Sequence, residues 1–259
     1  MSASDWALVT GASSGIGEQF AHALARRKQN LILVARSQDK LASLARELET
    51  AWGVQAEVFP CDLSVEGAGS ALAKSVLERQ GGVSLLVNNA GFGARGEFWK
   101  LSGERQRQMI KLHLASLVEL THHLLPGMIE RRAGGIVQVS SITGFQPIPY
   151  VAVYSATKAF ITHFSLALAE EARPFGVRVV TLCPGGTRTN FVIEGSRTGR
   201  GRFPAASMAP EAVVAEALAK LDAGGGMVIP GWANKMSVWI ERLVPRAWVP
   251  WAVAKMSRP

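Results

Sequence analysis

Residues 6–17 read Trp6-Ala7-Leu8-Val9-Thr10-Gly11-Ala12-Ser13-Ser14-Gly15-Ile16-Gly17, and this stretch decides the fold. An apolar run typical of a buried strand passes directly into glycines, and a helical pattern follows. Gly11 permits a tight turn, Gly15 lets a ligand approach the backbone, and Gly17 allows the helix to pack closely on the strand. The free N–H groups at the start of such a helix suit a pyrophosphate. The pattern predicts a dinucleotide-binding turn made by Gly11, Ser13, Ser14, Gly15, Ile16 and Gly17; a tight turn without a ligand is the alternative.

Apolar runs and helical patterns alternate along the rest of the chain. Continuous apolar strands separated by helices favour a parallel sheet covered on both faces, and right-handed crossovers then give a doubly wound α/β fold with seven strands. Ligands bind such folds at the carboxyl ends of the strands. The expected strands are Trp6–Thr10, Asn30–Arg36, Gln55–Phe59, Ser84–Asn88, Gly135–Ser140, Val177–Cys183 and Met227–Pro230, and the expected helices include Glu18–Lys28, Lys40–Ala51, Glu104–Leu125 and Ala152–Glu171.

Length and composition favour one large domain. The chain has 259 residues, of which 48% are hydrophobic, and no composition break divides it. We expect a Rossmann domain over residues 1–230, with a substrate lid at about 190–208, and a helical tail over 231–259. The first strand begins almost at the initiator Met, and the only cysteines are Cys61 and Cys183, which predicts a cytoplasmic protein.

The net charge of +8 would permit binding to anionic surfaces. No nucleic-acid motif accompanies it, so we expect no nucleic-acid partner. The histidines do not form a metal-ligand pattern either, and no metal is expected.

The end of the second strand bears on cofactor choice. An acidic residue there would bind the ribose 2′-hydroxyl of NAD, whereas this chain has Ala35 and then Arg36, which can pair with a 2′-phosphate. Ser13 could add a hydrogen bond, so NADP is the predicted cofactor. After the third strand, Asp62 could accept a hydrogen bond from the adenine amino group with Leu63 packed on the ring. A plain cap for the following helix is the alternative for Asp62.

Tyr154 and Lys158 form the main chemical signal. If residues 152–171 are helical, the two side chains lie one turn apart on the same face. A phenol ionises near pH 10, and a fixed ammonium nearby favours the phenolate and lowers its pKa. The pair therefore predicts a phenol that can act as general acid or base.

Five ordered motifs together resemble the short-chain dehydrogenase/reductase family. They are Thr10–Gly17, Asn88-Asn89-Ala90-Gly91, Ser141, Tyr154-x-x-x-Lys158 and Pro184-Gly185, and the resemblance covers roughly residues 5–230.

The resemblance implies a role for each motif. Tyr154 would give a proton to a carbonyl oxygen as NADPH delivers hydride to its carbon, Ser141 would polarise the same oxygen, and Lys158 would hold the nicotinamide ribose. Asn89, Ala90 and Gly91 would lie against the cofactor. In the loop after strand six, Pro184, Gly185, Thr187 and Thr189 match the family's Pro-Gly-x-x-x-Thr, with Thr189 on the carboxamide.

His113 departs from the family pattern, which usually has Asn at this position. The imidazole could replace the water that links the catalytic Lys to solvent, could pack without a chemical role, or could mark a weakened enzyme. We include His113 with Ser141, Tyr154 and Lys158 as candidate catalytic residues.

The substrate side is apolar by sequence. Phe191, Val192 and Phe203 lie in the expected lid, and Phe145 and Tyr150 lie on the approach to Tyr154. This predicts a lipophilic ketone, aldehyde or acyl substrate. Arg197, Arg200 and Arg202 could recognise an anionic carrier, although a solvated basic loop is the favoured interpretation.

The tail carries four of the seven Trp, and Met236, Trp239, Ile240, Leu243 and Val244 form one helical stripe. Pro245 would end that helix. The stripe could dock on the enzyme or a sister subunit, or lie on an anionic membrane surface at the inner face.

The sequence thus predicts an NADP-dependent oxidoreductase that forms a homodimer or homotetramer, as relatives commonly do. The alternatives are a 3-oxoacyl thioester reductase, and a weakly active NADP-binding sensor or interaction protein.

Overall fold

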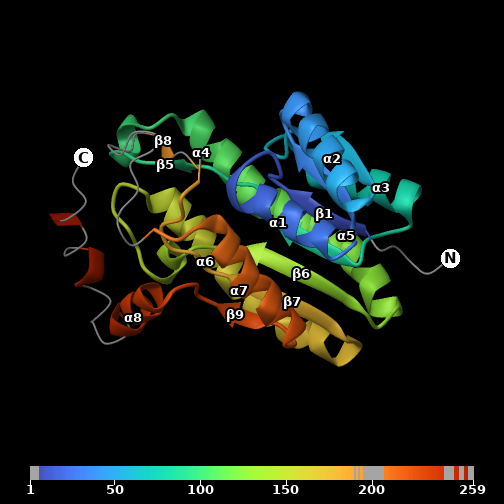
Figure 1. The fold of residues 1–259 in the computed structure, drawn as a ribbon. Coiled ribbons are helices and arrows are strands. Elements are labelled where there is room, and N and C mark those ends of the chain that lie inside the picture. Colours follow the sequence, from blue (N-terminus) through green and yellow to red (C-terminus); the bar gives the residue numbers. More distant parts are fainter. Residues whose placement is uncertain are drawn as a thin grey trace.

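The central element is a parallel sheet of seven strands in the order β3-β2-β1-β4-β6-β7-β9 (Figure 1). The computed structural model describes residues 6–189, 191, 193–194, 207–241, 248–250 and 254–255. The order reverses between β1 and β4, which creates the crevice where ligands bind in doubly wound folds. The strands are β1 (Trp6–Thr10), β2 (Asn30–Ala35), β3 (Ala56–Pro60), β4 (Leu85–Asn88), β6 (Gly134–Val139), β7 (Val177–Leu182) and β9 (Gly226–Val228).

Helices cover both faces of the sheet, as their amphipathic patterns require. The helices α1, α2 and α7 pack on one face, and α3, α5 and α6 pack on the other. Their bounds are α1 (Gly15–Arg26), α2 (Gln38–Trp52), α3 (Ala68–Gln80), α4 (Gly103–Ile110), α5 (Ser116–Glu130), α6 (Ala152–Ala172), α7 (Pro210–Asp222) and α8 (Trp232–Glu241), with short helices η1 (Phe98–Lys100), η2 (Lys111–Ala115), η3 (Ile142–Phe145) and η4 (Arg173–Phe175).

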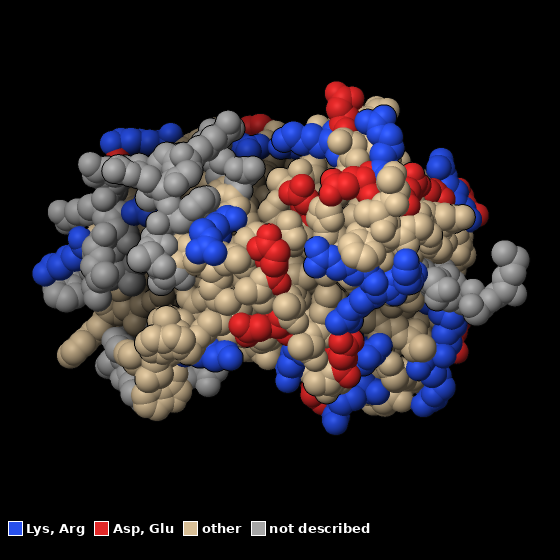
Figure 2. Space-filling model, viewed as in Figure 1, with Lys and Arg blue, Asp and Glu red and all other residues tan. Residues whose placement is uncertain are grey.

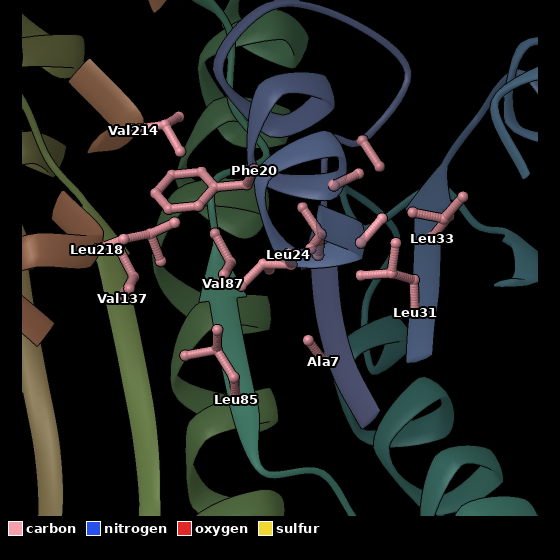
Figure 3. Packing of buried hydrophobic residues seen from close by; sticks show 14 of the residues in the cluster. Ala7, Phe20, Leu24, Leu31, Leu33, Leu85, Val87, Val137, Val214 and Leu218 are labelled. Atoms are coloured by element: carbon pink, nitrogen blue, oxygen red, sulfur yellow. The ribbon is translucent and has the colours of Figure 1, made fainter. Parts of the chain in front are cut away.

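The core is anchored where α1 crosses the first strands. Figure 3 shows Phe20 of α1 directed toward Val214 and Leu218 of α7, above Val87 and Val137 of the sheet. Phe20 is fully buried, and burial of a side chain of this size stabilises a fold by about 2–3 kcal/mol. This packing fixes the start of α1, and with it the glycine turn that follows β1.

The predicted sheet is confirmed, but one predicted helix is wrong as a single element. Residues 104–125 do not form one uninterrupted α-helix: α4 ends at Ile110, residues Lys111–Ala115 form the π-helical turn η2, and α5 begins at Ser116. Such turns insert one extra residue and frequently mark functional sites. Here the inserted turn contains His113.

Most of the expected lid, residues 190–208, lies outside the described residues, as do Val192, Phe203 and the three loop arginines. What is described of it forms two small pairings. Strand β8 (Ile193–Glu194) pairs in parallel with β5 (Gly93–Ala94), and Thr187 bridges to Met208. The loop after β7 is therefore tied to the loop after β4 directly above the carboxyl edge of the sheet.

Candidate active site

The glycine turn after β1 has the shape that a pyrophosphate requires. Gly11 and Gly15 have φ values of +67° and +62°, a region that residues with a Cβ rarely adopt. A Cβ on Gly17 would lie 2.3 Å from the carbonyl oxygen of Gly11. The chain can therefore make this turn only with glycine, and Ser14 and Ile16 lead directly into the first turn of α1. The residues present fit a dinucleotide phosphate at this helix start.

The Asn-Asn-Ala-Gly loop is held against that turn. Thr10 Oγ1 accepts hydrogen bonds from the backbone N–H groups of Asn89 and Ala90 at 2.9 and 3.0 Å. Asn89 Nδ2 donates to the carbonyl oxygen of Thr10 at 2.9 Å, and Asn88 Nδ2 donates to Thr121 Oγ1 at 3.2 Å. The loop thus links β1 to β4 across the switch point, and Ala90 and Gly91 are placed beside the glycine turn.

Asp62 is engaged locally. Its Oδ1 accepts hydrogen bonds from the backbone N–H and the hydroxyl of Ser64 at 2.9 and 2.7 Å. Burial alone would raise the pKa of Asp62, but the Ser64 bonds and the charges of Arg36 and Arg105 lower it overall. The alternative that Asp62 caps the next helix is wrong, because α3 begins at Ala68 after Gly67. Leu63 is buried, and its carbonyl oxygen accepts a hydrogen bond from Ser116 Oγ at 2.5 Å.

Arg36 lies at the end of the crevice where β2 and β3 finish. Its side chain is exposed, and its charge acts on the Asp62 carboxylate. The structure therefore places a cation near Asp62, the residue expected at the adenine.

The loop after β7 closes the other side of the crevice. Ser141 Oγ donates to the carbonyl oxygen of Pro184 at 3.4 Å, and Thr187 Oγ1 donates to that of Gly185 at 3.1 Å. A Cβ on Gly15 would lie 3.0 Å from Thr189 Cβ. Thr189 thus lies against the glycine turn, as the family pattern implies for a residue that contacts the cofactor.

Ser141, Tyr154 and Lys158 meet below this loop. Ser141 follows β6 and caps η3, while Tyr154 and Lys158 lie one turn apart on α6, and all three are buried. The Ser141 side chain lies close enough to the Tyr154 phenol to lower its pKa. Lys158 Nζ lies 5.7 Å from the centre of the Tyr154 ring and donates to the carbonyl oxygen of Val139 at 2.8 Å. The predicted trio is therefore assembled.

The pKa values of the trio differ from the expectation. Burial raises the pKa of Tyr154 to about 12, and the neighbouring Ser141 side chain opposes that rise only in part. Burial also lowers the pKa of Lys158 to about 8. The predicted lowering of the phenol pKa by Lys158 is thus not what the structure shows, because desolvation is the dominant cause and the opposing influence comes from Ser141. In this environment Tyr154 is a firmly protonated acid beside a readily deprotonated amine.

These pKa values predict how carbonyl reduction depends on pH. Tyr154 stays protonated up to about pH 12, whereas Lys158 loses its charge as pH rises through about 8. Because a charged Lys158 stabilises the phenolate left after proton donation, we expect kcat/KM to fall above about pH 8. Initial rates measured from pH 6 to about 10 check this; a rate that stays level to pH 10 would show that Lys158 remains charged.

His113 is fully engaged by hydrogen bonds. Its Nε2 lies 3.1 Å from the backbone nitrogen of Phe92, which donates to it, and its Nδ1 lies 2.8 Å from Thr157 Oγ1. Because Nε2 accepts, the proton belongs on Nδ1, which then donates to Thr157; Thr157 Oγ1 in turn donates to the carbonyl oxygen of Tyr154 at 2.8 Å. The imidazole connects the loop after β4 to the helix that carries Tyr154 and Lys158.

The surroundings keep His113 neutral. Burial and then the charge of Lys158 hold the pKa of His113 well below its ordinary value of 6.5. A Cβ on Gly91 would lie 2.8 Å from His113 Nε2, so the last glycine of the Asn-Asn-Ala-Gly loop makes room for the ring. The geometry favours packing with two specific hydrogen bonds over a proton relay.

An apolar wall stands over Tyr154. The Phe191 and Tyr154 rings lie 6.1 Å apart, and the guanidinium of Arg105 lies 3.6 Å from the centre of the Phe92 ring. A small cluster surrounds the phenol on this side, formed by Ala94, Met109, Val151 and Tyr154 with Phe92, Leu101, Ile148, Val153 and Ile193 packed against it. Phe92, Met109 and Thr157 were not among the predicted site residues, because only the fold brings them to Tyr154.

Comparison with known proteins places this site in a family. The family model described as short chain dehydrogenase matches residues 5–198. The solved structure of a short-chain dehydrogenase from Sphingobium yanoikuyae in complex with NADPH has a TM-score of 0.81 and 30% sequence identity, and the match covers 92% of this chain and 93% of that one.

Two curated relatives are longer than this chain. Very-long-chain 3-oxoacyl-CoA reductase of Macaca fascicularis is 34% identical over 184 residues, which are 70% of this chain and 58% of that protein. Inactive hydroxysteroid dehydrogenase-like protein 1 of Homo sapiens is 35% identical over 202 residues, which are 76% of this chain and 58% of that protein. The chain therefore spans less than two thirds of the length of either relative.

No helix among the described residues combines the length and apolarity needed to cross a bilayer.

The family match covers most of the chain and includes the glycine turn, Ser141, Tyr154 and Lys158. On these grounds the chain belongs to the short-chain dehydrogenase/reductase family of oxidoreductases.

Proposed function

We propose that the chain is an NADP-dependent reductase of a lipophilic ketone, aldehyde or acyl compound. The observation that carries this proposal is that Ser141, Tyr154 and Lys158 are all buried at the carboxyl end of the sheet, with Tyr154 one helical turn from Lys158. A phenol with a pKa of about 12 carries its proton at neutral pH, which is the protonation state that carbonyl reduction requires.

The residues that would hold the cofactor are the glycine turn, Arg36, Asn89 to Gly91 and the loop from Pro184 to Thr189. The chemistry that bound NADPH supplies is hydride. Tyr154 donates its proton to the substrate oxygen, and Ser141 hydrogen-bonds the same oxygen and polarises the carbonyl. Lys158 stabilises the phenolate that results.

The wall over Tyr154 supports a lipophilic substrate. Phe92, Leu101, Met109 and Phe191 all present apolar side chains on this side of the phenol. The very-long-chain 3-oxoacyl-CoA reductase relative is named for a substrate with a long acyl chain, which agrees with such a wall. This supports a second candidate, a 3-oxoacyl thioester reductase.

A catalytically weak nucleotide sensor is a further candidate because the human relative is named inactive. The intact contact between Ser141 and Tyr154 argues against it for this chain.

The test is NADPH consumption against lipophilic ketones, aldehydes and 3-oxoacyl thioesters, with NADH in parallel. Turnover of simple ketones or aldehydes supports the first candidate, and saturable turnover confined to thioesters supports the second. Tight NADPH binding without turnover on any of these compounds would support the sensor.

Arg36→Glu is expected to shift cofactor preference. A charge-assisted hydrogen bond to a 2′-phosphate contributes about 1.5–3 kcal/mol, so its replacement by a carboxylate should lower the preference for NADPH over NADH at least about 10-fold. The measurement is kcat/KM for both cofactors. Arg46→Ala, at an exposed position on α2, is the matched control. Equal loss with NADPH and NADH would remove Arg36 from the 2′-phosphate site.

A further inference from the structure

The helix α8 carries its apolar stripe on the outside of the molecule. Trp232, Met236, Trp239 and Ile240 are 80%, 46%, 56% and 51% exposed. Their spacing of i, i+4, i+7 and i+8 puts them on one face of the helix. The expected stripe is thus present in its described part, but it does not dock on the enzyme; Leu243, Val244 and Pro245 lie outside the described residues.

The opposite face of α8 fixes this orientation. Val238 is buried, and a Cβ on Gly185 would lie 2.3 Å from Asn234 Oδ1, so Asn234 is pressed against the loop after β7. Asn234 Nδ2 also donates to the carbonyl oxygen of Pro230 at 2.7 Å. On a helical wheel Asn234 and Val238 lie roughly opposite the stripe. Asn234 and Val238 therefore pack against the rest of the protein, and the Trp side chains of α8 face outward.

The stripe lies at the active-site end. The helix α8 contacts η3, which Ser141 caps, and it touches Gly185 of the cofactor loop. Figure 1 shows α8 and the β5–β8 pair at the end toward which β6 points. Close after β5 in the chain, Phe98 and Trp99 of η1 are 61% and 76% exposed. Large exposed aromatic side chains thus occur on both α8 and η1, at the end of the molecule that contains Tyr154.

Charge decides between possible occupants of this surface. Residues 232–259 contain Lys235, Arg242, Arg246, Lys255 and Arg258 against Glu241, a net charge of +4 within a total of +8. In Figure 2, tan side chains protrude at the lower left, where Figure 1 places α8, with blue side chains close by. A symmetric dimer through α8 would bring two copies of this positive segment together, which is unfavourable. An anionic lipid surface matches both the charge and the aromatic stripe, because Trp and basic residues favour the headgroup region.

We propose that α8 binds the headgroup region of an anionic bilayer and thereby turns the active-site end toward the membrane. The contact needs no spanning segment: Trp232, Met236, Trp239 and Ile240 enter the interface, and the net positive charge of residues 232–259 attracts anionic headgroups. A lipophilic substrate would then reach Tyr154 from the lipid phase, which is the only part of the inference that rests on the proposed function.

Flotation of the full chain with phosphatidylcholine vesicles, with and without phosphatidylserine, tests the proposal without any substrate. We expect flotation with the anionic vesicles and its loss at high salt. The double variant Trp232→Ser/Trp239→Ser should lower the bound fraction about 10-fold or more. Phe175→Ser is the matched control, since Phe175 is 41% exposed just before β7, at the amino-terminal end of the strands, whereas α8 lies at their carboxyl end.

NADPH binding by the double variant shows that it is folded. Three outcomes would overturn the proposal: no flotation of the unmodified chain with anionic vesicles, equal flotation of the double variant, or a dimer in size-exclusion chromatography that the double variant converts to monomer. The last outcome would assign the stripe to a second copy. None of the three bears on turnover, so the reductase proposal is judged separately.

Discussion

Tyr154→Phe is expected to lower kcat for NADPH-dependent carbonyl reduction by about 100- to 10,000-fold, the range that a positioned general acid contributes. The substitution removes one oxygen atom from a buried ring and leaves the ring contacts with His113 and Phe191 in place. Ser141 keeps its bonds with Pro184 and Thr143, so the loss of stability should be only about 1 kcal/mol. NADPH affinity, measured by fluorescence titration, should stay within about threefold.

The chain offers a matched control for this variant, because Tyr150 is the only other tyrosine. Tyr150→Phe removes the same atom four residues away and should leave kcat nearly unchanged. If Tyr154→Phe retained most of the turnover, the proton would come from another donor and the proposed mechanism would be wrong. If both variants bound NADPH but the unmodified chain also lacked turnover, the sensor reading would be favoured.

The sheet could be predicted from the sequence because its strands are buried on both faces. Runs such as Asn30–Arg36 and Val177–Cys183 are apolar without alternation, and each of the seven strands begins and ends within two residues of its expected bounds. The helix α3 (Ala68–Gln80) was not among the helices named, since its small residues give a weak apolar stripe. The local pattern of apolar residues was therefore sufficient to predict an element wherever its side chains are strongly buried.

The site was predictable where it depends on short motifs, and unpredictable where it depends on contacts between distant segments. Ser141, Tyr154 and Lys158 were placed together by their motifs. The pKa of Tyr154 was expected to fall, but its direction depends on desolvation, which needs the burial of the whole site. Phe92 and Thr157 give no sequence signal, because their role follows from their contacts with His113.

The π-helical turn η2, which contains His113, is another feature that the sequence does not predict. Nothing in Lys111-Leu112-His113-Leu114-Ala115 announces an extra residue in the turn. The turn places the imidazole between Phe92 and Thr157, where each ring nitrogen has a partner. A chain of four groups then runs from the Phe92 N–H through His113 and Thr157 to the Tyr154 carbonyl oxygen. We infer that His113 is a positioning residue that holds the catalytic helix to the loop after β4.

His113→Leu is therefore expected to damage stability and geometry together. It leaves the Phe92 N–H without its acceptor in a buried site and removes the partner of Thr157, which should lower the free energy of unfolding by about 2–4 kcal/mol. Because α6 is then no longer fixed to the loop, kcat should fall about 10-fold or more, as misplaced catalytic groups do. Urea denaturation and steady-state rates measure the two effects. His163→Leu is the matched control, at an exposed position on α6.

The pH dependence separates positioning from a proton relay. If His113 only positions α6, the His113→Asn variant should lower kcat without changing the shape of its pH profile, because a neutral His113 contributes no titration. Thr157→Val should act in the same direction, and combining it with His113→Leu should cost less than the sum of the two, since both break the same bond. A proton relay through His113 predicts a different result. The pH profile of His113→Asn would then differ in shape from that of the unmodified chain, and Thr157→Val would keep the kcat of the unmodified chain.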